Sequence, residues 1–333
     1  MVKTTETDDF LGRQGWGRAE RAPLAGDAST RHYIRLTRGP DTAILMQAPL
    51  DAMTAEFVMI DEILTGLGLS APRILSAVPE QGLILLEDFG DDTYTALLDR
   101  GTAAGPLYEL ATRTLIHLHQ GFNLEFTGAQ GLPDFGSDRF LEQSMLFAEI
   151  CLPDLADGKS NRLAESFRQA WKAPLANAMA VPRSLLLRDF HAGNLFHLPD
   201  RDGVRACGLI DFQDAGIGPV TYDLVSLLQD ARRDVAEGVT AAFLKSYLAA
   251  FPELDTVAFN ASYAVMAAQR HTRVIAIFNR LASQGKNGYL EHLPRLWRRL
   301  DEALKHPALV DVAAWFHRHM PPAVQIAQQG QQK

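Results

Sequence analysis

Three polar residues between positions 189 and 211 have the types and order that metal-assisted phosphoryl transfer requires. Asp189 and Asn194 are separated by four residues, and Asp211 follows a second β-like run. Phosphoryl transfer needs a carboxylate that orients and deprotonates the attacking hydroxyl, together with oxygen ligands that hold Mg²⁺ on the phosphates. Mg²⁺ is typically bound by one or two carboxylates, phosphate oxygens and water. Asp189, Asn194 and Asp211 therefore supply the residue types that such a site needs.

The same region contains a residue with an expected structural role. Asp223 follows Gly218-Pro219 at the start of a predicted helix, where an N-cap carboxylate accepts hydrogen bonds from backbone N–H groups. Taken singly, each Asp of the region is also compatible with a turn or a cap. The order Asp189, Asn194, Asp211 between short β-like runs is what favours a catalytic site. Those runs are predicted at Ser184–Leu187, Leu195–Leu198 and Arg205–Ile210.

The chain before residue 90 predicts a small antiparallel sheet. Arg31–Leu36 alternates between polar and apolar residues, and Thr42–Met46 follows it after a turn, which is typical of a hairpin. A helix capped by Asp51 is expected next, because apolar residues recur there at spacings of three and four. Two further strands are expected at Ile74–Val78 and Leu83–Leu86.

After residue 90, longer amphipathic patterns dominate and predict a mainly helical region. Helices are expected at Leu107–His119, Phe140–Cys151, Leu163–Met179, Asp223–Val235, Thr240–Phe251, Ala258–Leu281 and Leu293–Leu304. The sequence therefore predicts an α+β protein of two lobes. Residues 1–90 are expected to form a small antiparallel β-sheet lobe with one helix, and residues 91–333 a large, mainly helical lobe.

Composition and charge exclude several classes of protein. The chain has 333 residues, 47% hydrophobic and 22% charged, which is typical of a globular protein with a sizeable core. Its formal charge of −8 argues against nucleic acid as the main partner. The N-terminus lacks the apolar stretch of a signal peptide, and no segment approaches the ~18 apolar residues that span a bilayer. With only two cysteines, we expect a cytoplasmic protein without disulfides or a membrane partner.

The ordered set of motifs resembles the aminoglycoside phosphotransferase / protein-kinase-like superfamily. It is most similar to the bacterial N-acetylmuramate/N-acetylglucosamine anomeric kinases of cell-wall recycling. The matching strings are Gly26–Ser29, Leu86–Gly90, Asp211–Ala215, Gly218–Leu228 and Gln269–His271, and the resemblance spans about residues 24 to 300. It implies a protein-kinase-like bilobal fold, ATP and Mg²⁺ as cofactors, and phosphorylation of an amino sugar at its anomeric hydroxyl. It also implies that Asp189 is the catalytic base and that Asn194 and Asp211 are metal ligands.

The resemblance also implies a nucleotide site in the N-terminal lobe. Residues 26–30 correspond to a loop that covers the phosphates, with contacts from Ser29, Thr30 and backbone N–H groups. The segment after Leu83–Leu86 corresponds to the hinge between kinase lobes, where the main chain of Glu87 and Phe89 would pair with adenine.

The sequence departs from the protein-kinase pattern at one cation. Protein kinases carry a lysine on the third strand, but the only lysine of this chain before residue 159 is Lys3. Arg31 or Arg35, on the preceding strand, could supply the phosphate-binding cation, because guanidinium binds phosphate bidentately. Either arginine is equally compatible with a solvated position on the strand face.

The charge of the helical region favours a neutral or anionic acceptor over a polycationic aminoglycoside. Between Arg270 and His306, eight lysines and arginines outnumber three acidic residues. Arg270 and His271 are candidates to contact the lactyl carboxylate of N-acetylmuramate, although a solvated helix face explains the same charges. Gln213 and Asp214 are alternative contacts for the sugar.

Two alternative functions stay open at this point. One is a kinase of another small alcohol, such as an aminoglycoside, choline or homoserine. The other is a nucleotide-binding pseudokinase scaffold, which the missing lysine motivates. The sequence leaves the oligomeric state, the preferred amino sugar and the preferred purine open.

Overall fold

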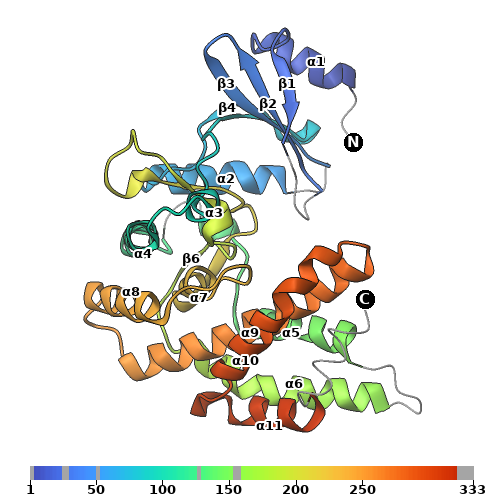
Figure 1. The fold of residues 1–333 in the computed structure, drawn as a ribbon, viewed down its shortest axis with the longest axis vertical. Coiled ribbons are helices and arrows are strands. Elements are labelled where there is room, and N and C mark those ends of the chain that lie inside the picture. Colours follow the sequence, from blue (N-terminus) through green and yellow to red (C-terminus); the bar gives the residue numbers. More distant parts are fainter. Residues whose placement is uncertain (1–3, 25–29, 50–52, 126–128, 153–158, 321–333) are drawn as a thin grey trace. The chain divides into compact units, whose positions relative to one another are not determined.

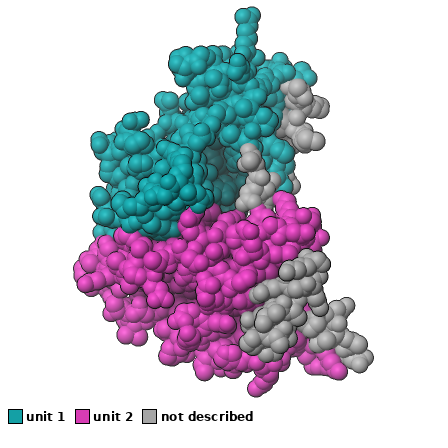
Figure 2. Space-filling view, viewed as in Figure 1, with its two compact units in different colours: residues 1–130, 192–215 teal, residues 131–191, 216–333 magenta. Residues whose placement is uncertain are grey.

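The computed structural model describes residues 4–24, 30–49, 53–125, 129–152 and 159–320 (Figure 1). The chain forms two compact units, residues 1–130 with 192–215 and residues 131–191 with 216–333 (Figure 2). The predicted lobe boundary at residue 90 lies inside the first unit. Long-range contacts explain this grouping: Ser70 forms a β-bridge with Gly208, and the His117 imidazole bonds the carbonyl of Leu67.

The first unit contains a five-stranded antiparallel sheet. The predicted hairpin is confirmed as β2 and β3, with Arg38 opposite Asp41 at the turn. The two later strands are confirmed as β4 and β5. The sheet order is β1 (Glu20–Pro23), β2 (His32–Arg38), β3 (Asp41–Gln47), β5 (Leu83–Glu87) and β4 (Ile74–Val78).

The two faces of this sheet have different functions because side chains alternate along each strand. One face carries buried apolar residues that pack against Phe10, Leu11 and Trp16 from the N-terminal region. The opposite face carries Tyr33 and Arg35 toward a pocket. The buried sheet residues of the first face are Leu36, Ala43, Leu45, Leu83 and Leu85.

The first unit contains a helix that the sequence did not predict. Helix α1 (Thr4–Arg13) precedes the sheet, so the N-terminal region has α1 in addition to the single expected helix, α2 (Thr54–Gly66). Apart from Phe10 and Leu11, the segment is mostly polar, so its periodic signal is weak. The expected cap Asp51 lies outside the described residues. Helix α2 starts after Met53, which has a left-handed backbone.

The remainder of the first unit connects the sheet to the predicted catalytic segment. It contains α3 (Tyr94–Asp99), α4 (Ala104–Gly121) and the two-stranded sheet of β7 (Leu195–His197) and β8 (Cys207–Leu209). Strand β7 begins one residue after Asn194, and β8 ends two residues before Asp211. This β-ladder brings Asn194 and Asp211 to the same end.

The second unit is mainly helical, as predicted. Strands β6 (Arg183–Leu186) and β9 (Gly216–Pro219) pair and precede Asp189 and Asp223 respectively. Helix α7 ends at Leu228, earlier than the predicted end at Val235, and residues 229–236 form a connection to α8. The helices are α5 (Ser137–Cys151), α6 (Lys159–Ala178), α7 (Thr221–Leu228), α8 (Glu237–Ala250), α9 (Thr256–Ser283), α10 (Leu293–Ala303) and α11 (Val310–His319).

Two further expectations concern the type of protein. Cys151 and Cys207 are buried, and neither forms a disulfide. Within the described ranges, no helix has the length and apolar character needed to cross a membrane.

Candidate active site

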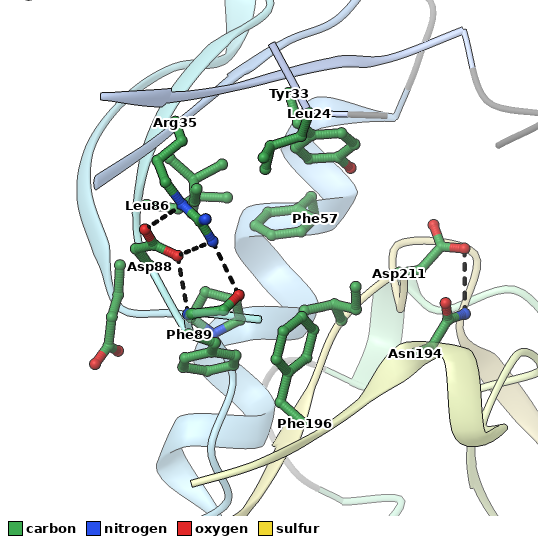
Figure 3. Close-up of a pocket in the computed structure, with 15 residues that line it drawn as sticks. Leu24, Tyr33, Arg35, Phe57, Leu86, Asp88, Phe89, Asn194, Phe196 and Asp211 are labelled. Atoms are coloured by element: carbon green, nitrogen blue, oxygen red, sulfur yellow. Dashed lines mark hydrogen bonds and ion pairs between the residues drawn. The ribbon is translucent and has the colours of Figure 1, made fainter. Parts of the chain in front are cut away.

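The first unit contains a pocket of about 330 Å³ on the Tyr33 face of the sheet (Figure 3). Its wall is mainly apolar, which suits a planar aromatic base. Glu87 and Phe89, predicted to contact adenine, both line it, and so do Asn194 and Asp211. Other apolar lining residues, which the sequence analysis did not identify, are Leu24, Tyr33, Ile44, Phe57, Leu86, Phe196 and Ile210.

The hinge segment that borders this pocket is fixed by packing and by ion pairs. The Phe89 ring lies 5.7 Å from that of Phe196 and against Gly208, where an added Cβ would come within 2.9 Å of it. The Glu87 carboxylate bonds the guanidinium of Arg201 at 2.5 Å and the backbone N–H of Arg73 at 3.1 Å. The Glu87 side chain thus stabilises this segment through contacts within the protein.

Arg35 is bound to the same hinge. Its Nε lies 2.7 Å from Asp88 Oδ2, and its Nη2 lies 3.0 Å from Asp88 Oδ1, so the pair is bidentate. Arg35 also donates to the Gly90 carbonyl and to Asp91, both at 2.9 Å. Figure 3 shows the Arg35 guanidinium turned toward Asp88. These bonds use the guanidinium N–H groups that a phosphate would otherwise bind.

Arg31 lies beside Asp211, a predicted metal ligand. Its guanidinium is 3.8 Å from a carboxylate oxygen of Asp211, and only 10% of its side chain is exposed. Burial and the nearby Asp211 raise the pKa of the Tyr33 phenol to about 12. Arg31 forms a hydrogen bond with this phenol and partly opposes the shift. Arg31 is therefore the arginine placed near the predicted metal ligand. Of the predicted phosphate loop, Ser29 lies outside the described residues, and Thr30 is exposed.

Asn194 and Asp211 are brought together, as Figure 3 shows. The Asn194 amide nitrogen lies 3.4 Å from Asp211 Oδ2. Asp211 has a positive φ of 61°, a conformation that non-glycine residues adopt only under constraint. The constraint comes from its neighbours: the Phe212 ring stacks on Phe57 of α2 at 4.8 Å, and Gln213 donates to Asp211 Oδ1 at 3.0 Å.

This pair fits a magnesium ion bound together with nucleotide phosphates. Asp211 is 42% exposed, so its carboxylate can reach a ligand, and the Asn194 amide adds an oxygen. Within the described residues, no group of three or more His, Cys, Asp or Glu is placed to hold a metal. A site of one carboxylate and one amide leaves the remaining positions to phosphate oxygens and water, as Mg²⁺ commonly requires. Gln213 is 3% exposed and orients Asp211, while Asp214 is partly exposed.

In the second unit, Asp189 is accessible and surrounded by cations. Its side chain is 34% exposed, and Arg270 Nη1 lies 3.5 Å from its Oδ1. Desolvation alone would raise the pKa of Asp189, but Arg270, His191, Arg273 and Arg188 outweigh it and lower the pKa to about 2. Asp189 is therefore ionised at neutral pH and can accept a hydrogen bond from a hydroxyl.

Asp223 holds the backbone from which Asp189 projects. It is buried, and its carboxylate accepts hydrogen bonds from the backbone N–H groups of Leu187 at 2.6 Å and Arg188 at 2.8 Å. Arg188 has a positive φ of 70°, which these bonds stabilise. Burial raises the pKa of Asp223 to about 7 despite both bonds. The expected helix cap is instead Val220, because α7 begins at Thr221.

Arg270 and His271, proposed as acceptor contacts, are both buried. Arg270 is 4% exposed and donates to the Arg188 carbonyl at 3.1 Å and to the Tyr222 hydroxyl at 3.4 Å. His271 is 1% exposed, and its Nε2 bonds Gln229 at 2.8 Å. The contacts of Arg270 therefore indicate a positioning role toward Asp189. Neither residue lies on a solvated helix face, the alternative that the sequence left open for this segment.

Two relatives with known names are similar to this chain over most of its length. The chain is 38% identical to the N-acetylmuramate/N-acetylglucosamine kinase of Caulobacter vibrioides, over 94% of this chain and 95% of that protein. It is 32% identical to the protein of that name from Pseudomonas aeruginosa, over 90% of this chain and 89% of the relative.

Solved structures show the same fold at much lower sequence identity. The streptomycin–ATP ternary complex of APH(2″)-IIa matches with a TM-score of 0.59 and 18% identity, covering 92% of this chain and 98% of that chain. This match confirms the predicted protein-kinase-like fold. The sequence pattern of the phosphotransferase enzyme family matches residues 20–259, which include every predicted catalytic and metal-binding residue. The chain is an enzyme that belongs to the phosphotransferase enzyme family.

Proposed function

We propose that this enzyme transfers the γ-phosphoryl group of ATP to the anomeric hydroxyl of N-acetylmuramate or N-acetylglucosamine. The product is the sugar 1-phosphate, a form in which peptidoglycan sugars can be reused. The observation that carries the sugar assignment is the 38% identity, over 94% of the chain, to a kinase named for these two sugars. The ionised, accessible Asp189 supports the chemistry.

Asp189 is proposed as the residue that orients the acceptor. Its carboxylate accepts a hydrogen bond from the sugar hydroxyl, and the hydroxyl oxygen then forms a bond to the γ-phosphorus as the bond from that phosphorus to the β-phosphate oxygen breaks. The hydroxyl proton passes to Asp189. A carboxylate with a pKa near 2 is a weak base, so its main contribution is position, consistent with the loose transition state of phosphoryl transfer.

The first unit is proposed to bind Mg·ATP. The adenine base would occupy the apolar pocket. Arg31 would supply the phosphate-binding cation, the role of the third-strand lysine in protein kinases, which this chain lacks. Asn194 and Asp211 would hold Mg²⁺, which neutralises charge on the phosphates. Because Arg35 is bonded to Asp88, we assign it to the hinge and not to the phosphates.

Phosphorus NMR of the enzyme with Mg·ATP and single acceptors tests this proposal. The acceptors are N-acetylmuramate, N-acetylglucosamine, choline and kanamycin. We expect a new phosphate signal, correlated with the anomeric proton, for at least one amino sugar. Phosphorylation of choline or kanamycin alone would contradict the sugar assignment. ATP binding without turnover of any acceptor would favour the scaffold alternative.

The variant Asp189→Asn tests the catalytic role. We expect kcat to fall about 10²- to 10⁴-fold with nucleotide binding retained, since a positioned base contributes that much. Asp202→Asn is the matched control because its side chain is fully exposed, at 101%. Unchanged turnover in Asp189→Asn would show that another group orients the hydroxyl.

A further inference from the structure

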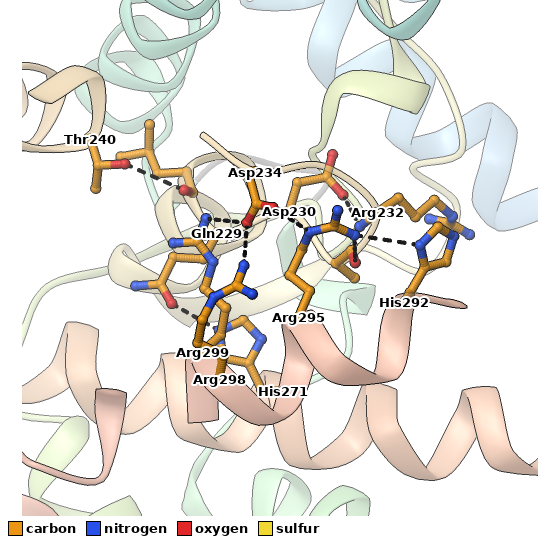
Figure 4. A network of polar contacts seen from close by, with 12 residues as sticks. Gln229, Asp230, Arg232, Asp234, Thr240, His271, His292, Arg295, Arg298 and Arg299 are labelled. Carbon is orange, nitrogen blue, oxygen red and sulfur yellow. Dashed lines mark hydrogen bonds and ion pairs between the residues drawn. The ribbon is translucent and has the colours of Figure 1, made fainter. Parts of the chain in front are cut away.

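The second unit presents a cationic and aromatic site beside Asp189 that the proposed catalytic residues do not include. It lies where the connection 229–236 meets helices α9 and α10 (Figure 4). Arg232, on this connection, is exposed, and its Nη1 lies 3.5 Å from His191 Nε2. His191 is only two residues beyond Asp189, and its backbone N–H bonds the Asp189 carbonyl at 3.1 Å.

Aromatic rings form one side of this site. The Arg232 guanidinium carbon lies 5.8 Å from the centre of the Phe278 ring. The same ring lies 4.9 Å from Tyr289 and 5.7 Å from His292, both of which are partly exposed. Figure 4 shows Arg232 and His292 next to each other. Phe278 is only 3% exposed, so the rings that a sugar could reach are those of Tyr289 and His292, beside the charged head of Arg232. This combination is suited to a sugar that carries a carboxylate.

The connection that bears Arg232 is fixed from both sides. Buried Asp230 accepts a hydrogen bond from the Arg232 backbone N–H at 2.9 Å. Asp234 lies 3.1 Å from Arg295, 2.8 Å from Arg298 and 3.6 Å from Arg299, all on α10. These contacts hold the connection in place, so the Arg232 backbone is ordered before a ligand arrives, which reduces the entropic cost of binding.

Arginines slightly outnumber acidic residues here. Positions 229–236 and helix α10 together contain five arginines, Arg232, Arg233, Arg295, Arg298 and Arg299, and four acidic residues, Asp230, Asp234, Asp301 and Glu302. Glu291, just before α10, lies 3.6 Å from His292 Nε2. Arg295 Nη1 also approaches His292 Nδ1 at 3.5 Å. Burial and the neighbouring arginines lower the pKa of His292, although Glu291 and Asp230 act in the opposite direction. The imidazole is therefore neutral at pH 7, and the arginines carry the positive charge.

We propose that Arg232, together with His292, binds the lactyl carboxylate of N-acetylmuramate and so determines the preference for this sugar over N-acetylglucosamine. The inference rests on the proposed function and names the specificity residue of the same acceptor site. The reacting hydroxyl and the lactyl group are on the same ring, two carbons apart, and the contact of Arg232 with His191 places this cation near the segment that carries Asp189. Arg270 and His271 do not fill this role because both are buried and bonded within the protein.

The experiment compares kcat/KM for the two sugars in Arg232→Ala, Arg232→Lys and Arg280→Ala. Arg280 is the control because it is an exposed arginine on α9, the helix that carries Phe278. It is two positions from Phe278, and residues two positions apart on a helix point to different sides, so Arg280 points away from the Phe278 side. We expect Arg232→Ala to lower the ratio of N-acetylmuramate to N-acetylglucosamine values about 10- to 100-fold, as loss of a charge-assisted hydrogen bond does. Arg232→Lys should retain part of the ratio, and Arg280→Ala all of it.

A ratio equal to that of the unchanged enzyme in Arg232→Ala would overturn the inference. Calorimetric binding of N-acetylmuramate to the same proteins separates this failure from failure of the proposed function. If neither sugar is phosphorylated but N-acetylmuramate binds and Arg232→Ala weakens that binding, the carboxylate site stands and the proposed reaction falls. If N-acetylmuramate neither reacts nor binds, both proposals are wrong.

Discussion

The ion pair between Arg35 and Asp88 offers a direct test of how the hinge is stabilised. Replacing Arg35 with Met keeps most of the side-chain volume but removes the guanidinium. Asp88 is only 5% exposed, so its carboxylate would lose its bidentate partner in a place that water barely reaches. We expect a clear loss of folding stability, because a buried carboxylate without a partner is strongly unfavourable.

The magnitude follows from the exposure of each partner. Breaking a fully buried pair costs about 3–5 kcal/mol. Arg35 is 21% exposed, and its second carboxylate partner, Asp91, is 78% exposed. The Asp91 contact should therefore contribute less than about 1 kcal/mol. With the partial exposure of Arg35 taken into account, we expect Arg35→Met to lower the free energy of unfolding by about 2–4 kcal/mol.

A matched pair on the same strand provides the control. Arg38 pairs with Asp41 at 3.1 Å, but both side chains are exposed, at 48% and 59%. Two double-mutant cycles would be measured. The first combines Arg35→Met with Asp88→Asn, and the second combines Arg38→Met with Asp41→Asn. Urea unfolding, followed by far-UV circular dichroism and tryptophan fluorescence, gives the coupling energy of each pair. We expect about 2–4 kcal/mol for the first cycle and below about 1 kcal/mol for the second.

Equal coupling in the two cycles would refute this reasoning, since burial of the carboxylate is the main difference between the pairs. A change in the urea dependence itself would instead indicate an altered unfolded or native ensemble, so the m-values must agree before the energies are compared.

Three further predictions concern the site. Arg270→Met should raise the pKa of Asp189 from about 2, because it removes the nearest cation. Since the ionised carboxylate is required, the kcat/KM of this variant relative to the wild-type enzyme should fall as the pH drops below about 5. A relative kcat/KM that does not depend on pH would contradict this. Asp223→Ala leaves two buried N–H groups without an acceptor, and urea unfolding should show a loss of about 2–6 kcal/mol. Arg31→Ala should weaken binding of Mg·ATP, measured by calorimetry, more than binding of adenosine, since Arg31 lies 3.8 Å from the predicted metal ligand Asp211 and does not itself line the pocket. An equal loss for both ligands would contradict this.

Local patterns in the sequence were enough to predict much of the fold. Alternation identified β2 and β3, and the spacing of apolar residues identified α2, α4 and α9 within a few residues. These signals are local because a strand or helix buries one face at a fixed period. Helix α1 escaped detection because its ten residues contain few apolar positions. Helix α7 was predicted too long, because the apolar pattern continues through Val235 while the backbone leaves the helix after Leu228.

The sequence also determined which residues could perform the chemistry. The order Asp189, Asn194, Asp211 and Asp223, with the family resemblance that it carries, predicted a base, two metal ligands and a structural aspartate. Side-chain types at fixed spacing are sufficient for this, because phosphoryl transfer restricts the groups that can act.

Only the tertiary structure decided what each arginine does. Arg31 and Arg35 are indistinguishable by alternation, but Arg35 meets Asp88, 53 residues away, while Arg31 lies beside Asp211. Arg270, expected at the substrate, is buried against the loop of Asp189, and the exposed Arg232 lies in a connection that was predicted as helix. A guanidinium is long and flexible, so its partner depends on which distant carboxylate or carbonyl folding brings within reach, and sequence spacing does not encode that choice.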